Sequence, residues 1–119
     1  MKLNILERLL GIGLIIAYES EHPKGNFITL KTVNLLQNKL LVNEEEVKKY
    51  NLRIEDNQYK WDDAGSLEYT DFDLTEGEKK ILVEGLVILN KTEQLTKEHN
   101  SLIDKLVPDP ESTFALSNE

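Results

Sequence analysis

The sequence contains no cysteine, and this absence removes several kinds of chemistry at once. Without a thiol the chain can form no disulfide, no thiolate zinc site and no cysteine nucleophile. The absence is compatible with a reducing compartment, and we take the cytoplasm as the expected location of the protein.

The sequence also lacks an apolar run long enough to cross a membrane. Its longest run, Leu9 to Tyr18, is about half of the roughly 20 residues that a membrane-spanning helix needs. Only Lys2 and Arg8 precede this run as charged cations, and no small-residue cleavage site follows it. We therefore expect neither a membrane span nor a signal peptide.

Basic residues are scarce in one part of the chain. Between Glu55 and Glu78 a single base, Lys60, stands against nine acids, so this stretch carries the whole net charge of −8. The nine acids are Glu55, Asp56, Asp62, Asp63, Glu68, Asp71, Asp73, Glu76 and Glu78. Phosphate backbones are bound by clustered Lys and Arg, so the charge argues against nucleic acid as a direct ligand. A basic protein partner, a cation and simple solvation all remain open.

Residue types that carry catalysis or bind metals do not form a recognisable motif. The two histidines, His22 and His99, are far apart in the sequence, so we expect surface roles for both and no metal site. Residues 71–82 begin like a calcium loop, but Glu76 and Leu82 occupy the positions that require glycine and glutamate. We expect no enzyme activity, no metal and no cofactor; a small enzyme or metal-binding protein is the third interpretation.

What the sequence does contain is a strong set of helix signals. The central one is Thr75 to Asn90, where seven of the nine residues from Ile81 to Leu89 are apolar. A helix that is apolar on most sides must be packed on several sides. Capping boxes predict three helix starts, at Asn4 with Glu7, at Asn43 with Glu46 and at Thr75 with Glu78. We expect helices over residues 4–17, 29–41, from 43, 75–90 and 96–106, with close helix packing at Gly11 and Gly13.

After Tyr50 the apolar residues change from helical spacing to alternation. Leu52 to Trp61 predicts a β-hairpin that turns at Asp56 and Asn57. Residues 62–65 predict a second turn, and residues 67–74 a third strand with a bulge near Thr70. Beyond Pro108 we expect a disordered acidic tail over residues 108–119.

These elements predict a single α+β domain over residues 1–107. It has about five helices around a two- to three-stranded antiparallel sheet, in the order three helices, three strands, two helices. A winged helix also places three helices before a hairpin, which would suggest DNA. The acids at Glu44, Glu45 and Glu46 and in the hairpin region disagree with DNA and favour a protein partner.

Four short stretches resemble a family of small phage and prophage proteins of unassigned function. They are Glu7–Leu10, Gly25–Lys31, Asn43–Glu46 and Leu95–His99. The resemblance covers the chain to about Leu106. It implies a phage-encoded protein made in the cytoplasm of a bacterial host, and it brings no catalytic residues.

We expect a non-enzymatic accessory protein that binds a basic or nucleic-acid-handling protein through its acidic surface. The candidate contact residues are Trp61, Asp62, Asp63, Glu68, Asp71 and Asp73. Trp61, with Tyr59 and Tyr69, is either an exposed aromatic anchor for the partner or part of the packing between sheet and central helix. The alternative function is a virion or assembly component that works by self-association.

Overall fold

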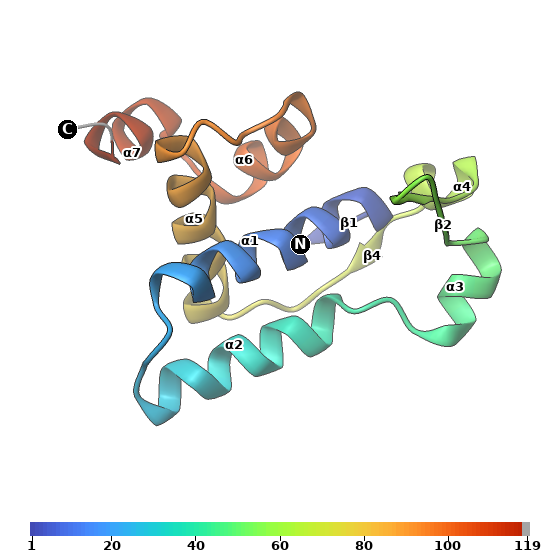
Figure 1. The fold of residues 1–119 in the computed structure, drawn as a ribbon, viewed down its shortest axis with the longest axis horizontal. Helices are drawn as coiled ribbons and strands as arrows, with labels where there is room; N and C mark the ends of the chain where they lie inside the picture. The colour runs from blue at the N-terminus through green and yellow to red at the C-terminus, as the bar shows by residue number, and fades with distance from the viewer. Residues whose placement is uncertain (118–119) are drawn as a thin grey trace.

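Helix α1 lies in the middle of the molecule, and the other helices are arranged around it (Figure 1). The computed structural model describes residues 1–117, and its fold class is α+β with helices dominant. In chain order the elements are β1 (Lys2–Leu3), α1 (Ile5–Glu21), α2 (Phe27–Leu40), α3 (Glu44–Tyr50), β2 (Arg53–Glu55), β3 (Gln58–Lys60), α4 (Asp63–Leu67), β4 (Thr70–Asp71), α5 (Glu76–Lys91), the 3-10 helix η1 (Lys97–His99), α6 (Asn100–Leu106) and α7 (Pro110–Ser117).

Helix α5 is the packed helix that the apolar stretch predicted. It packs against α1, α2, α6 and α7, so it has neighbours on several sides. The most deeply buried apolar side chains of the core come chiefly from α1, α2 and α5, and they include Leu14, Ile15, Leu36, Leu40, Leu82 and Leu86. Burial of these side chains is the main stabilising contribution to the fold.

Two glycines allow helices to approach each other closely. A Cβ atom on Gly85 would lie 2.5 Å from the carbonyl oxygen of Leu14, so α5 crosses α1 in direct backbone contact. A Cβ atom on Gly11 would lie 2.9 Å from Cδ1 of Leu40, which confirms close packing at that position. Gly13 does not pack in this way, because it is exposed and a Cβ atom there would meet nothing within 4 Å.

The helix starts agree with the predicted capping boxes. The side chains of Asn4, Asn43 and Thr75 each accept a hydrogen bond from the backbone N–H three residues on. The glutamate at that position accepts a hydrogen bond from the backbone N–H of the cap residue. Helix α2 begins earlier than expected because Asn26 caps it and accepts from the Thr29 backbone N–H. Helix α1 continues beyond its expected end at residue 17.

The sheet differs from the one that the alternation predicted. Strands β2 and β3 form the expected hairpin, with Asp56 and Asn57 at φ angles of 53° and 63°. Positive φ at both central residues is typical of a tight two-residue hairpin turn. The expected third strand over residues 67–74 is wrong, because residues 63–67 form helix α4 and only Thr70 and Asp71 form a strand.

The short strand β4 pairs with β1 rather than with the hairpin. Lys2 lies opposite Asp71 and Leu3 opposite Thr70, so the N-terminal residues supply the partner strand. The expected turn at residues 62–65 is instead the start of α4, with Asp62 at its N-cap position. The strands therefore form two separate pairs rather than one sheet. Three helices do precede the hairpin, as in a winged helix, but within residues 1–117 no third strand pairs with the hairpin.

The tail also differs from the expected disorder. Residues 110–117 form helix α7, which packs against α5, and Phe114 contacts the core. The backbone carbonyl of Asp109 accepts from the Thr113 N–H at 3.1 Å, which supports the first turn. Residues 118–119 lie outside the described residues. In the part of the chain that the structure describes, none of the helices has both the length and the hydropathy that a membrane span requires.

One substitution made at two glycines tests the crossing of α1 and α5. Gly85→Ala should lower the free energy of unfolding by about 1–3 kcal/mol, because the added methyl group meets backbone that cannot move aside. Gly13→Ala is the control and should raise it by about 0.5–1 kcal/mol, because its surroundings are open and alanine favours helix. Urea unfolding measures both changes, and similar effects at the two sites would contradict the close crossing.

Candidate functional site

The predicted acidic contact residues do not form one patch of free carboxylates. Asp71 Oδ1 lies 3.0 Å from the amino nitrogen of Met1, and Asp62 Oδ1 lies 3.8 Å from Nη1 of Arg53. Asp63 and Asp73 are exposed, and neither side chain makes an ion pair with another described residue. The acids that are adjacent in the sequence therefore have different surroundings in the fold.

Glu68 is bound within the structure. Its Oε2 accepts a hydrogen bond of 2.7 Å from the Tyr50 hydroxyl and lies 3.1 Å from Nζ of Lys49. Both donors favour the charged carboxylate and hold the pKa of Glu68 below its usual range. Because Lys49 and Tyr50 both belong to α3, Glu68 connects α3 to the segment that follows α4.

Trp61 packs against helix α4. A Cβ atom on Gly65 would lie 2.8 Å from Cδ1 of Trp61, so the indole covers this glycine closely. The Trp61 Nε1–H donates to the Ser66 hydroxyl at 2.8 Å. Packing is thus what the structure shows for Trp61, although onto α4 rather than onto the central helix. Tyr59, in contrast, is 56% exposed.

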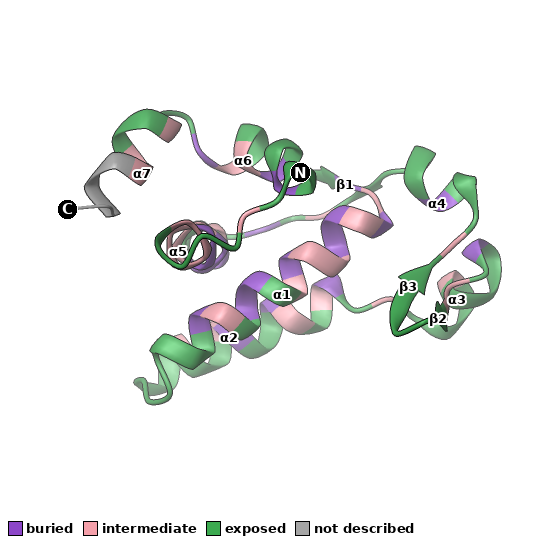
Figure 2. Cartoon of the chain, turned by 45° about the horizontal axis from the view of Figure 1, so that its top comes forward, coloured by how far each residue is buried: buried purple, intermediate pink, exposed green. Residues whose placement is uncertain are grey.

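Helix α1 is apolar around most of its circumference, and it packs against α5, α2 and α4, yet one stripe of it stays partly open to solvent. Residues three and four apart share a helix face, and the outward stripe consists of Leu9, Ile12, Gly13, Ile16, Ala17 and Ser20. Ile16 is 62% exposed. Figure 2 shows exposed and intermediate residues along α1 beside its buried side. A helix that is apolar all round is normally buried, so this open face is unusual.

The outward stripe of α1 is the floor of an open groove of about 440 Å³. Leu41 and Val42 from the α2–α3 connection and Leu52 and Tyr59 from the hairpin region form its walls. The groove is therefore built from three segments that are distant in the sequence.

A second groove of about 300 Å³ shares Gly13 and Ile16 with the first and continues to the end of α5. We name the two together the α1 groove. Its lining residues are Leu9, Ile12, Gly13, Ile16, Ala17, Ser20, Glu21, Leu41, Val42, Leu52, Tyr59, Ile88, Leu89, Thr92 and Gln94. Glu21 is the only charged residue among them, Ser20, Thr92 and Gln94 are polar at the same end, and the rest of the lining is mainly apolar.

The hairpin presents an apolar face of its own beside this groove. Ile54 lies directly opposite Tyr59 across the two strands, and side chains opposite each other point to the same face. Ile54 is 68% exposed. Because Tyr59 also lines the groove, this exposed face of the hairpin extends the apolar surface of the α1 groove.

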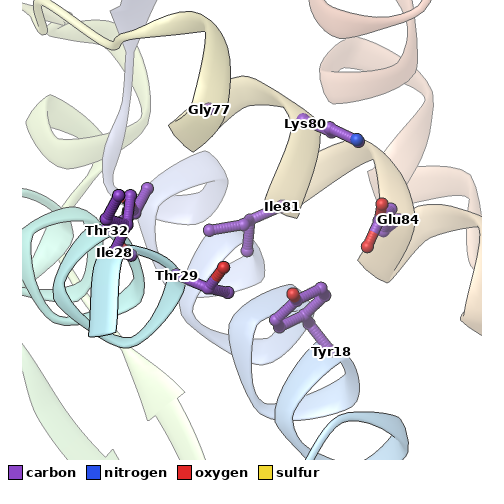
Figure 3. A pocket seen from close by; sticks show the side chains of 8 residues that line it. All are labelled: Tyr18, Ile28, Thr29, Thr32, Gly77, Lys80, Ile81 and Glu84. Atoms are coloured by element: carbon purple, nitrogen blue, oxygen red, sulfur yellow. Dashed lines mark hydrogen bonds between the residues drawn. The ribbon is translucent and has the colours of Figure 1, made fainter. Parts of the chain in front are cut away.

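A smaller pocket of about 230 Å³ lies where α1, α2 and α5 meet (Figure 3). Tyr18 and Ile81 line it from opposite helices, and Lys80 points away from the Tyr18 ring. Burial, with the charge of Glu84 adding to it, raises the pKa of Tyr18 above its usual range. The Tyr18 ring also stacks on His22 with 4.5 Å between ring centroids. These contacts fix the end of α1. Among the residues that line this pocket, no side chain forms a hydrogen bond or an ion pair with the side chain of another.

Buried charges hold the helices that frame the α1 groove. Arg8 is buried and forms two hydrogen bonds to the Glu46 carboxylate, one of them from Nη2 at 3.1 Å. Its Nη2 and Nε also donate to the carbonyls of Leu41 and Leu40 at 2.7 and 3.2 Å. The bonds from Arg8 lower the pKa of Glu46. Arg8 thereby attaches the end of α2 and the start of α3 to α1.

Glu78 forms the corresponding link at the start of α5. Its Oε1 accepts from Nζ of Lys39 at 2.7 Å and from the Thr75 backbone N–H at 2.8 Å. Burial opposes the charge on Glu78, but these donors outweigh burial, and the pKa of Glu78 lies below its usual value. Lys39 therefore joins α2 to α5 through a buried carboxylate.

His99 corrects the expectation that both histidines have surface roles. It is buried, and its Nδ1 accepts a hydrogen bond of 3.0 Å from the backbone N–H of Thr96. Burial lowers the pKa of His99, so the neutral imidazole is favoured. His22 is exposed, as expected.

Comparison with known proteins gave no relative. No protein-family model, curated protein or solved structure matches this chain. The resemblance to phage proteins therefore stays a prediction. Within residues 1–117 no three His, Asp or Glu side chains are grouped so that they could hold a metal ion.

Apart from Tyr59, which the sequence offered as a possible aromatic anchor, the residues of the α1 groove were not among the predicted contact residues. The sequence of α1 has apolar residues on more than one face, a pattern that is typical of a buried helix. The signal that was available is the excess itself, since a helix with apolar residues on all faces needs more partners than a small domain supplies. Which face stays open depends on where α2, α5 and the hairpin lie.

Glu78 predicts a specific dependence of stability on pH. Its pKa is lower in the folded state than in the unfolded state, so its contribution is complete above about pH 4.3 and is lost as the pH falls through the folded pKa. Glu78→Gln should cost about 1–3 kcal/mol at neutral pH. It should also reduce the loss of stability on acidification. Urea unfolding from pH 7 downward measures both effects.

The control for this experiment is Glu76→Gln. Glu76 is in the same first turn of α5, but its side chain is 94% exposed. This variant should follow the wild-type dependence on pH. Identical curves for Glu78→Gln and Glu76→Gln would contradict a structural role for the buried pair.

Proposed function

We propose that this protein acts by binding another protein, without chemistry of its own. The observation that carries this proposal is the α1 groove, an open apolar surface on a chain in which 30% of the residues are charged. The centres of protein interfaces are depleted in charged residues and enriched in aromatic ones. Contiguous exposed apolar surface of this kind typically marks an interaction site.

The charge of the protein favours a basic partner. With a net charge of −8, the chain attracts cationic surfaces and repels acidic ones and nucleic acid. Asp62 and Asp63 are exposed near the hairpin, and such charges act mainly on the rate of encounter. Glu68 and Asp71 make closer ion pairs, at 3.1 and 3.0 Å, than Asp62 does, and we assign these two residues to stability in this proposal.

The setting follows from the resemblance described above. We place the protein in a bacterial cytoplasm as a phage accessory protein, with a host or phage protein as its partner. Handling of nucleic acid belongs to that partner in this proposal.

Self-association is the second candidate function. It is favoured by the same observation, because an uncharged apolar helix face can pack against its own copy. The net charge of −8 on each copy opposes it. Sedimentation at micromolar concentration distinguishes a dimer from a monomer that awaits a different partner.

A charge-reversal experiment tests the basic partner. The partner is recovered from bacterial lysate with the tagged protein, and its association and dissociation rates are measured. Asp62→Lys with Asp63→Lys should slow association by roughly 3- to 10-fold with little change in dissociation, and added salt should slow the wild-type protein similarly. The Asp62 carboxylate makes no capping bond to α4, so the fold should survive.

The matched control reverses two exposed acids elsewhere, Glu98→Lys with Asp104→Lys. It makes the same change in net charge on η1 and α6, and it should slow association less. If both double variants and the wild type associate at one rate, independent of salt, the acidic residues do not guide a partner. Failure of the wild-type protein to capture any partner in lysate would contradict the proposed function itself.

A further inference from the structure

The floor of the α1 groove has the shape that a second helix needs. Its residues repeat at three and four positions along α1, and rows with this spacing receive the side chains of a helix packed across them. Gly13 in the middle of the floor has open space above it, so a facing backbone can approach closely there. From Leu9 to Ser20 the floor is about 17 Å long, which is enough for roughly three turns of a helix.

The walls of the groove provide contacts along the length of such a helix. Tyr59 and Leu41 are exposed beside the first half of the floor, and Ile88 and Leu89, near the end of α5, lie beside the second half. Exposed aromatic side chains beside a groove are common anchors in interfaces. A strand added to the hairpin would use only three residues on each edge, so the helical floor offers the longer contact.

The charges around the groove determine the chemistry of the occupant. None of the lining residues is basic, and Glu21 stands at one end. Beyond the hairpin wall, Asp63 is exposed without an ion pair to another described residue, next to Asp62, which lies 3.8 Å from Arg53. A helix with an apolar stripe and flanking Lys or Arg residues therefore matches both the floor and its surroundings. A second copy of this chain would add another net charge of −8 instead.

From this geometry we infer that the α1 groove binds one amphipathic, basic α-helix of the partner, laid along α1. The inference rests on the proposed function and specifies the part of the partner that is recognised. Binding buries Ile16, Tyr59 and the open surface at Gly13, and it leaves the basic residues of the partner helix near Glu21 and Asp63.

A synthetic peptide provides the probe. It is a fluorescently labelled peptide of about 14 residues, built from Leu at helical spacing and Lys elsewhere, which forms roughly four turns. A second peptide carries Glu in place of Lys. Anisotropy titration of the full chain gives the affinity for each peptide, and circular dichroism reports whether the peptide becomes helical. We expect one Leu/Lys peptide to bind per chain in helical form, and the Leu/Glu peptide to bind at least about tenfold more weakly.

The decisive variant is Ile16→Glu, because groove binding and simple charge attraction predict opposite effects. The added carboxylate makes the protein more attractive to a cationic peptide, but it places a charge on the apolar floor. We expect the affinity for the Leu/Lys peptide to fall at least about tenfold. Ile28→Glu is the matched control, since Ile28 is 75% exposed on α2 and outside the groove. It should leave the affinity unchanged or slightly higher.

Tyr59→Ala provides a second test that does not depend on α1, and it should also weaken binding. The inference is overturned if Ile16→Glu binds the peptide as tightly as the wild type, or if the Leu/Glu peptide binds equally well. It is also overturned if the wild type sediments as a dimer that Ile16→Glu dissociates, because the occupant is then a second copy. If a captured partner binds the wild type and Ile16→Glu equally, the inference fails while the proposed function stands.

Discussion

Three glutamates that each make two kinds of contact hold this structure together. Each accepts the backbone N–H of a helix cap, and each also binds a cation from another helix. The pairs are Glu7 with Lys105, Glu46 with Arg8 and Glu78 with Lys39, at sequence separations of 98, 38 and 39 residues. The glutamates that cap helices locally thus also connect helices that are distant in the sequence. These pairs join α1 to α3 and α6, and α2 to α5, and so connect the helices that carry the walls of the α1 groove.

The difference between local and long-range interactions explains what the sequence could predict. The capping boxes at Asn4, Asn43 and Thr75 and the turn at Asp56 and Asn57 involve residues a few positions apart, and all were predicted correctly. The pairing of β1 with β4 joins residues about seventy positions apart, and nothing in either strand specifies the other. Similarly, no local pattern distinguishes a glycine at a helix crossing from an exposed one.

The candidate site shows the same limit. Acids concentrated in the sequence between residues 55 and 78 are distributed over a hairpin, two short elements and the start of α5, where several become internal ion pairs. The α1 groove, in contrast, is assembled from four separate segments, and only α1 carries a signal of its own, in its excess of apolar residues. Composition gave the net charge of the chain but not its distribution around the groove. It could not predict the floor, because the exposed face of α1 depends on which of its faces α5 and α2 cover.

The crossing of α1 by α5 also has a consequence for the order in which the protein is made. Leu14 and Gly85 are in backbone contact, yet their codons are some seventy apart. At a synthesis rate of about 5–20 residues per second, α1 leaves the ribosome roughly 4 to 14 s before its partner. During this interval both apolar faces of α1 are uncovered, although only one is uncovered in the finished fold. The nascent chain therefore exposes more apolar surface than the folded protein and is more prone to aggregate. Binding of a chaperone to α1 during synthesis would protect it from aggregation.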